Sequence, residues 1–349
     1  WNALKFIGPS GLFLDGNEAR EMRAVVESPF ARATWDRIGT VETDDAAIQR
    51  HIDAILALPF IDVDGIRARR FHVALDCVRG AGGRFMPTLL DRFGCIVSGI
   101  NMEVDGRFPR PPEPVAENLG ELEALVKKCG AAVGFAVDPD VDRLALVSDE
   151  GRAIGEDYTL ALAASVVLGH RGGPVVTNLS TSRIVDDVAE RAGRAVVRAP
   201  VGEVNVATRM RSEGAAIGGE GNGGVILTEM HLGRDAPVGV ALILQLLHQE
   251  DRSLSAIVSD YPRYSIVKDK LDLPAAPLDS VYRILRTTFP DADVDTQDGM
   301  RLSWSDRWLH VRPSGTEPIV RVIAEAPTAD AAKAMIIAGR EAVERLTAA

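Results

Sequence analysis

The chain has 349 residues, of which 46% are hydrophobic and 5% aromatic, and a formal net charge of -11. This length fits roughly two to four domains, whose cores must be filled mainly by aliphatic side chains. The acidic charge argues against a nucleic-acid or acidic-membrane partner, no apolar run reaches membrane-spanning length, and no signal peptide is visible. The cysteines are odd in number and lack a C-x-x-C spacing, which predicts a reduced, cytoplasmic setting.

The first 42 residues are short for a domain. They contain a turn at residues 8–11 and a helix predicted over residues 17–27, with Asn17 as its candidate N-cap. A segment of this size cannot bury much apolar surface by itself. We therefore expect another part of the same domain, or another domain, to cover it.

From residue 43 the pattern changes to alternating helices and strands, which predicts an α/β unit with a parallel-type sheet up to residue 150. We expect helices over 44–58, up to 90 and over 118–129, and strands over 71–77 and 131–137. The strand at 71–77 runs into the glycine-rich turn 79–83. A strand, a glycine-rich turn and a helix are compatible with phosphate binding, although these glycines equally serve close packing between helix and sheet.

Three aspartates follow the strand at 131–137. Asp138, Asp140 and Asp142 alternate along the chain, and Arg143 comes directly after them. Alternate side chains of an extended or gently curled segment point the same way, so the three carboxylates can converge. Three like charges at short range repel strongly, and a divalent cation removes that repulsion. Carboxylate oxygen is the ligand type that Mg²⁺ selects, so we predict a Mg²⁺ site on these three residues.

The sequence of this loop also allows other interpretations. An exposed loop with scattered aspartates is the common alternative. An EF-hand calcium loop is excluded, because its sixth position would be Arg143 rather than Gly and its twelfth Asp149 rather than Glu. A phosphatase that uses the aspartate at a strand end as its nucleophile stays open. Such an enzyme would have a small hydroxyl residue soon after the second aspartate, where this chain has Asp142.

A second α/β unit is predicted over residues 151–262. We expect helices over 158–168, 184–192, up to 211 and over 238–249, and strands over 174–177, 195–198 and 215–218. The last strand delivers the loop 219–224, in which Glu220 and Asn222 stand among four glycines. Flexible glycines let the backbone approach a ligand, and a carboxylate with an amide can bind the vicinal hydroxyls of a sugar. An ordinary tight turn with exposed polar residues is the alternative.

The residues from 263 to 349 predict a smaller α+β domain. We expect a strand near 264–273, a helix over 280–289, two alternating strands around the turn 305–307, and a last helix capped by Thr328. The apolar face of that last helix is predicted to carry Ala332, Met335, Ile336, Val343 and Leu346.

A phosphate site is predicted between two strands of this last domain, in the stretch 312–318. Arg312 supplies a guanidinium, Ser314 and Thr316 supply hydroxyls, and Gly315 frees the backbone, which together suit a phosphate group. Arg321 adds a second cation nearby. A turn that merely carries polar residues is the alternative interpretation.

With these loops in this order, the chain resembles the α-D-phosphohexomutase family. The resemblance rests on Asp138-x-Asp140-x-Asp142-Arg143, on residues 219–223 and on residues 312–318. It implies related α/β domains followed by a smaller α+β domain: a C-terminal remnant of domain 1 at 1–42, then domains at 43–150, 151–262 and 263–349. The fold class is thus α/β, with tandem three-layer α/β/α domains and mixed sheets.

The resemblance also implies roles for individual residues. It implies Mg²⁺ on the three aspartates, sugar recognition at Glu220 and Asn222, and Arg143 facing the transferring phosphoryl group. Lys5 matches a lysine that in some members is proposed as an acid/base group. The substrate phosphate is expected on Arg312, Ser314, Gly315, Thr316 and Arg321.

The implied reaction moves phosphate between the 1- and 6-positions of a hexose through a phosphoserine and a bisphosphorylated intermediate. The implied partner is a phosphorylated hexose, and glucose, mannose and glucosamine stay open as the sugar. A second copy of the chain, as a homodimer, is a further candidate partner. The alternative function is a non-catalytic phosphosugar-binding or regulatory protein.

Two departures from the family pattern bear on activity. The family's phosphorylated serine lies in a T/A-S-H-N-P loop of the first domain, and this loop is not found in the sequence. We therefore expect the chain as given to be inactive as a mutase and its parent to be active. Some members carry a histidine two residues after the position of Asn222, where this chain has Gly224. No proton-transfer role is assigned there.

Overall fold

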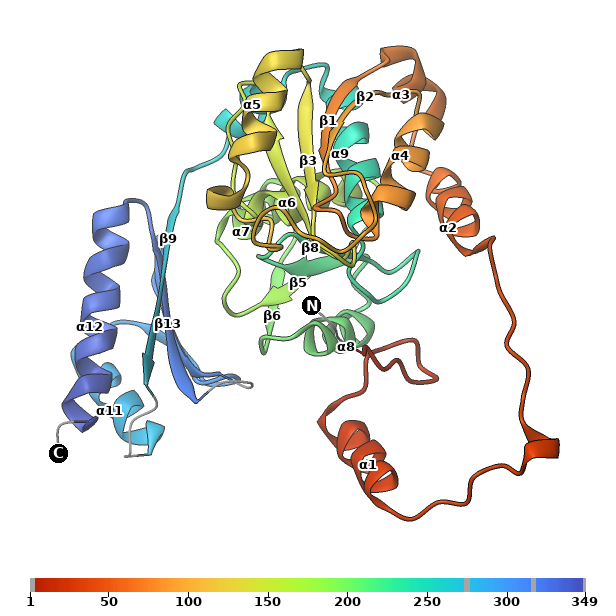
Figure 1. Ribbon diagram of the computed structural model, residues 1–349. Helices are drawn as coiled ribbons and strands as arrows, with labels where there is room; N and C mark the ends of the chain where they lie inside the picture. Colours follow the sequence, from red (N-terminus) through yellow and green to blue (C-terminus); the bar gives the residue numbers. More distant parts are fainter. Residues whose placement is uncertain (1–3, 273–276, 315–317, 348–349) are drawn as a thin grey trace.

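The computed structural model describes residues 4–272, 277–314 and 318–347, with side chains as far as residue 344. Its described strands form three sheets, two of them mixed and one antiparallel, in chain order (Figure 1). The predicted fold class, tandem α/β units followed by a smaller α+β domain, is confirmed. No helix within the described ranges is both long and apolar enough to cross a membrane. The predicted domain boundaries stay predictions.

Residues 16–46 of the N-terminal segment lie apart from the sheets as an extended arm (Figure 1), whereas Lys5 pairs with Asp142 and Leu12 belongs to the same buried cluster as Val176. The helix α1 (Gly16–Glu27) buries no residue, and Leu12 is the one side chain of residues 4–46 that is buried. The predicted cap Asn17 is wrong. Asp15 caps α1, because it accepts from the backbone N–H of Glu18 at 2.9 Å while Glu18 accepts from the backbone N–H of Asp15 at 3.0 Å. This reciprocal pair satisfies two backbone donors, which Asn17 inside the helix cannot do.

The first sheet has the strand order β2-β1-β3-β4, in which β1 is parallel to β2 and β3, and β4 is antiparallel to β3. Its strands are β1 (His72–Asp76), β2 (Ile96–Ile100), β3 (Val133–Val137) and β4 (Leu144–Ser148). Its helices are α2 (Ala47–Leu56), α3 (Val63–Arg69), α4 (Gly82–Arg92) and α5 (Gly120–Cys129). The strands β2 and β4 and the helix α3 were not predicted.

The second sheet repeats this topology, with the order β6-β5-β7-β8, two parallel pairs and one antiparallel pair. Its strands are β5 (Val175–Asn178), β6 (Val196–Ala199), β7 (Ile217–Glu220) and β8 (Gly224–Leu227). Its helices are α6 (Asp157–Leu168), α7 (Ile184–Arg191), α8 (Glu203–Glu213), α9 (Ala236–Glu250) and α10 (Leu254–Ser259). The predicted metal and sugar motifs thus occupy equivalent places, at the carboxyl ends of β3 and β7.

The two mixed sheets share one hydrophobic core. Buried side chains from Ile52 to Val258 form a single cluster that contains most of α6 and α9. These two helices are apolar nearly all round, as expected for helices buried between two layers. The backbone adds two links, from Leu144 N to Gly223 O at 2.9 Å and from Ala236 N to Val141 O at 3.2 Å. This shared packing places the ends of β3 and β7 beside each other.

The third sheet is antiparallel, with the order β10-β11-β12-β13-β9. Its strands are β9 (Ser265–Asp272), β10 (Asp293–Asp295), β11 (Met300–Ser303), β12 (Trp308–Pro313) and β13 (Ile319–Ala326). Its helices are α11 (Leu278–Thr288) and α12 (Ala329–Thr347). The predicted buried face of α12 is confirmed for Ala332, Met335, Ile336 and Val343. The Leu346 side chain lies outside the described residues.

His310 joins the third sheet to the second. Its side chain is fully buried, its Nδ1 lies 2.9 Å from Ser180 Oγ, and its Nε2 lies 2.7 Å from the carbonyl oxygen of Asp298. The carbonyl can only accept, so Nε2 carries the proton and Nδ1 accepts from Ser180. Both ring nitrogens are satisfied in the neutral form. Burial lowers the pKa of His310 to about 4.

We expect acid to weaken the fold through His310. A lowered histidine pKa means that the folded state holds the neutral ring, so this stability is present above pH 6.5 and is lost as the pH falls toward 4. Urea denaturation should show a loss of about 2 kcal/mol between pH 7 and pH 5 that is absent in His310→Gln. Parallel pH profiles for the two proteins would contradict this account.

Candidate functional site

The three aspartates after β3 converge, as the sequence predicts. One carboxylate oxygen of each, from Asp138, Asp140 and Asp142, lies within 4.8 Å of the others. Asp138 folds the loop back by accepting from the backbone N–H groups of Asp142 and Arg143, at 3.0 and 3.1 Å. The loop is more tightly curled than expected, because Val141 has a φ of 66°. A β-branched residue rarely adopts this conformation, and such strain is concentrated at functional sites.

The charges of this loop are only partly balanced by the protein. Burial, followed by the charges of Asp142 and Asp140, raises the pKa of Asp138 to about 7. Burial also opposes ionisation of Asp142, but Arg234 and Lys5 leave the pKa of that carboxyl below its ordinary value. Asp142 Oδ1 is buried and accepts no hydrogen bond from the described residues. An orphan oxygen beside two further carboxylates fits a hard divalent cation such as Mg²⁺.

Lys5 and Arg143 both lie against the aspartate loop. Lys5 Nζ pairs with Asp140 and lies 2.6 Å from Asp142 Oδ2. Burial lowers the pKa of Lys5, but the two aspartates outweigh burial and raise it, so the ammonium stays charged. Arg143 Nε lies 3.8 Å from Asp138 Oδ2 and 3.7 Å from Asp142 Oδ1. These distances are too long for hydrogen bonds, so Arg143 supplies positive charge beside these two aspartates without being fixed to them by hydrogen bonds.

A cavity of about 490 Å³ opens over the aspartate loop. Its charged lining comes from Lys5, Arg79, Glu113, Asp138, Asp140, Asp142, Arg143 and Arg234. The predicted glycine-rich turn reaches the cavity with Gly80 and Ala81. Packing alone requires Gly80, because a Cβ there would lie 2.6 Å from the carbonyl oxygen of Pro139. The turn therefore serves packing and also forms a wall of the cavity.

The predicted sugar loop is a tight hairpin. Glu220 is the last residue of β7 rather than a loop residue, and β8 begins at Gly224, so the two strands are antiparallel neighbours. Asn222 Oδ1 accepts from the backbone N–H of Gly224 at 3.2 Å and stabilises the turn. Gly223 has a φ of 87°, and a Cβ there would lie 2.4 Å from Leu144 O. Only glycine lets the hairpin approach the strand β4 so closely.

Glu220 is held by three donors. Its Oε1 accepts from Asn178 Nδ2 at 2.8 Å and from Gly202 N at 3.1 Å, and its Oε2 lies 3.3 Å from Arg234 Nη1. The side chain is 6% exposed. A buried carboxylate whose two oxygens both accept hydrogen bonds is held in one position. A sugar hydroxyl that reaches Glu220 would therefore meet a hydrogen-bond acceptor that is already oriented.

Arg234, for which the sequence predicted no role, connects the two mixed sheets. Its guanidinium lies 2.8 Å from Asp142 Oδ2, 2.9 Å from Glu203 Oε2 and 3.3 Å from Glu220 Oε2. A Cβ at Gly224 would lie 2.2 Å from Arg234 Cδ, so the arginine stem fills the space beside that glycine. The sequence feature that could have indicated a role for Arg234 is the pair Arg234-Asp235, which comes directly before the long apolar helix α9.

Arg312 anchors the predicted phosphate loop. Its Nε donates to Asp298 Oδ2 at 2.8 Å, and the same oxygen accepts from Val201 N at 3.0 Å. Arg321 stands directly opposite Arg312 in the β12–β13 ladder, so both side chains lie on one face. Gly315 and Thr316 lie outside the described residues.

These contacts form one chain across all three sheets. Arg312 binds Asp298, Asp298 binds Val201, and the next residue, Gly202, binds Glu220. Glu220 binds Arg234, which binds Asp142 in the aspartate loop. The structure thus brings the predicted metal, sugar and phosphate motifs into one connected region. The two repeated mixed sheets and the antiparallel sheet agree with the resemblance to the α-D-phosphohexomutase family.

Sequence comparison assigns the family. Three family models of phosphoglucomutase/phosphomannomutase match the chain: α/β/α domain II over residues 49–151, α/β/α domain III over 155–264, and the C-terminal domain over 268–338. A probable phosphoglucosamine mutase from Methanopyrus kandleri is 36% identical, over 95% of this chain and 74% of that protein. A phosphoglucomutase/phosphomannomutase from Thermococcus kodakarensis is 36% identical, over 99% and 76%. The chain belongs to the phosphoglucomutase/phosphomannomutase family.

Solved structures agree with this assignment. A phosphoglucomutase/phosphomannomutase family protein from Burkholderia thailandensis superposes with a TM-score of 0.80 at 25% identity, over 95% of this chain and 70% of that one. A putative phosphomannomutase from Thermus thermophilus gives a TM-score of 0.78 at 25% identity, over 96% and 73%.

Proposed function

We propose that this protein is a phosphohexomutase that interconverts hexose 1-phosphate and hexose 6-phosphate through a phosphoserine and a hexose bisphosphate. The observation that carries this proposal is the contact chain from Arg312 to Asp142, because it joins a phosphate-type loop to a metal-type loop. The Arg312 end suits the phosphate that stays on the sugar. The Asp142 end suits the phosphate that is transferred.

The proposed mechanism depends on positioning and charge neutralisation, as phosphoryl transfer generally does. Arg312 and Arg321, with Ser314, Gly315 and Thr316, would hold the phosphate that is not reacting. Glu220 and Asn222 would bind the sugar hydroxyls between the two ends. Arg143 and Lys5 would face the oxygens of the transferring phosphoryl group. Mg²⁺, when bound to Asp138, Asp140 and Asp142, would neutralise charge on that group.

The proposed acid/base role of Lys5 has a physical constraint. An ammonium paired with Asp140 and Asp142 can donate a proton but cannot accept one. Lys5 would therefore act as the acid toward a leaving oxygen, and only the neutral amine left after that proton transfer could act as a base.

Three sugars are candidates for the substrate, because the relatives carry the names phosphoglucosamine mutase and phosphoglucomutase/phosphomannomutase. The test is an assay of the protein expressed from its own start codon, with the 1-phosphates of glucosamine, glucose and mannose. Formation of a 6-phosphate from at least one of them is expected. Release of free phosphate would favour the phosphatase alternative, and tight binding without turnover would favour a regulatory protein.

The inactivity of the chain as given stays a prediction, as do a cytoplasmic location and a homodimer. Steady interconversion of the two sugar phosphates by the 349-residue chain alone would contradict the first of these.

The proposed metal site predicts the effect of Asp140→Asn. Asp140 is about half exposed and, unlike Asp138, accepts no hydrogen bond from the loop backbone, so the variant should fold. We expect at least about a tenfold loss of Mg²⁺ affinity, because one anionic ligand is removed. Calorimetric titration measures it, with the exposed Glu117→Gln as a charge-matched control. Equal affinity in both variants would remove Asp140 from the site.

A further inference from the structure

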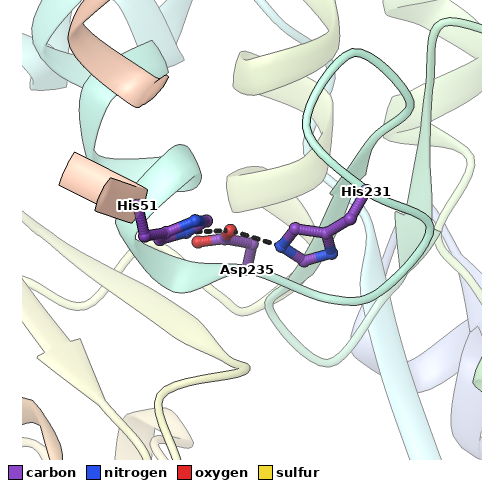
Figure 2. Close-up of side chains that lie close together, drawn as sticks. All are labelled: His51, His231 and Asp235. Carbon is purple, nitrogen blue, oxygen red and sulfur yellow. Dashed lines mark hydrogen bonds and ion pairs between the residues drawn. The ribbon is translucent and has the colours of Figure 1, made fainter. Parts of the chain in front are cut away.

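Two histidines contact the same aspartate, Asp235 (Figure 2). His51 Nε2 lies 2.7 Å from Asp235 Oδ2, and His231 Nε2 lies 2.8 Å from the same oxygen. His51 belongs to α2 of the first mixed-sheet unit, whereas His231 and Asp235 lie between β8 and α9 of the second. The cluster therefore ties the two units together.

The proton positions in this cluster follow from its neighbours. The backbone N–H of Gly233 donates to His231 Nδ1 at 3.1 Å, so Nδ1 must be an acceptor and Nε2 carries the hydrogen. His231 thus donates to Asp235. The other aspartate oxygen, Oδ1, accepts from Val238 N at 2.9 Å. Although burial alone would raise it, the hydrogen bonds from His231 and His51 lower the pKa of Asp235 to about 2.

Two imidazoles and a carboxylate are also a set of ligand types that suits zinc. The structure argues against that use. A metal needs the lone pair of His231 Nε2, and the hydrogen bond from Gly233 forces that nitrogen to carry a proton instead. The cluster is therefore a hydrogen-bonded clamp around a charged aspartate.

The clamped residue sits at a junction of the candidate site. Asp235 caps the N-terminus of α9 and donates its own N–H to Val225 O at 2.8 Å. The next residue, Ala236, donates to Val141 O inside the aspartate loop at 3.2 Å. The preceding residue is Arg234, whose guanidinium joins the aspartate loop to Glu220. Fixing Asp235 fixes the point from which the Arg234 side chain leaves the backbone.

We propose that His51 and His231 are positioning residues: by clamping Asp235, they hold Arg234 so that Glu220 and the hairpin keep the geometry that binds the sugar. This inference rests on the proposed function and deepens it, because it names residues outside the cavity that set sugar recognition. The clamp acts on the sugar and metal end of the site. The Arg312 loop lies on a different sheet and is connected to Glu220 through Asp298 and the Val201–Gly202 backbone, so the clamp acts on it less directly than on Glu220.

The test compares two probes, glucose 1-phosphate and inorganic phosphate, by calorimetric titration of the full chain with Mg²⁺ present. The wild type should bind glucose 1-phosphate more tightly than inorganic phosphate, because the sugar adds contacts. In His51→Ala the affinity for glucose 1-phosphate should fall roughly ten- to a hundredfold, the effect of losing one charge-assisted contact, while the affinity for inorganic phosphate stays unchanged.

Matched variants separate positioning from general loss of structure. In His51→Gln the amide nitrogen can reach the place of the imidazole Nε2 and donate to Asp235, so sugar affinity should be restored. In His51→Asn the shorter amide cannot reach Asp235, so the loss of affinity for glucose 1-phosphate should persist. His231→Ala, on the more exposed side of the cluster, should reproduce the His51→Ala result. Circular dichroism checks that each variant is folded.

The outcomes distinguish the two proposals. If the wild type shows no preference for glucose 1-phosphate over inorganic phosphate, the proposed function fails, and the clamp fails with it. If the wild type shows the preference and folded His51→Ala and His231→Ala keep it, the clamp alone is overturned. An equal loss with both probes, or no difference between His51→Gln and His51→Asn, would also overturn it.

Discussion

Replacing Arg234 with methionine should lower the free energy of unfolding by about 3–5 kcal/mol, the typical cost of removing one partner from a buried ionic group. Arg234 and its partners Glu203 and Glu220 have side chains no more than 10% exposed. Without the guanidinium, two carboxylates are left buried side by side. Urea denaturation at pH 7.5 measures the loss.

Two controls sharpen this prediction. Arg234→Lys keeps a positive charge but cannot reach three carboxylates. Its free energy of unfolding should therefore lie between those of the wild type and Arg234→Met. Burial raises the pKa of Glu203, and Arg234 opposes that effect, so the pKa should rise further in Arg234→Met. A raised carboxyl pKa adds stability as the pH falls, and the variant should recover part of its loss near pH 5. A loss below about 1 kcal/mol would show that the arginine is not a structural hub.

Replacing Arg312 with alanine should weaken phosphosugar binding by about 3 kcal/mol, more than a hundredfold, because a charge-assisted contact to phosphate is lost. Asp298 would also be left without its arginine partner. Titration with glucose 1-phosphate and Mg²⁺ measures the change. Arg312→Lys should recover only part of the affinity, because an ammonium cannot bind two phosphate oxygens in parallel.

Arg307→Ala is the matched control, since Arg307 lies in the same domain, half exposed, and pairs with its neighbour Asp306. It should bind as the wild type does. A loss in Arg307→Ala equal to that in Arg312→Ala would indicate a general charge effect and would leave the phosphate loop without support.

The aspartate loop was predictable because its chemistry is local. Three carboxylates in phase after an apolar strand specify both a place in the fold and a need for a cation. Hydrophobic periodicity likewise predicted α6, α9 and the buried face of α12. The strands β2 and β4 were missed for opposite reasons. The edge strand β2 is partly exposed and carries no continuous apolar run, whereas the short β4 follows a charged loop at once.

The role of Arg234 could not be predicted because it depends on long-range contacts. Arg234 is 92 positions from Asp142 in the chain, and nothing in its own neighbourhood indicates that partner. The two clamp histidines are likewise distant from each other in sequence. Only the shared core of the two mixed sheets brings such residues together. The prediction that Glu220 lies in a loop was wrong, because β7 extends through the glycines before it and ends at Glu220.

One crystal structure would test the central claim most directly: the chain with Mg²⁺ and glucose 1,6-bisphosphate. We predict the cation on Asp138, Asp140 and Asp142, one phosphate beside it, and the other phosphate on Arg312, with the sugar against Glu220. A bisphosphate bound without contact to either Asp140 or Arg312, or a cation bound elsewhere, would contradict the account.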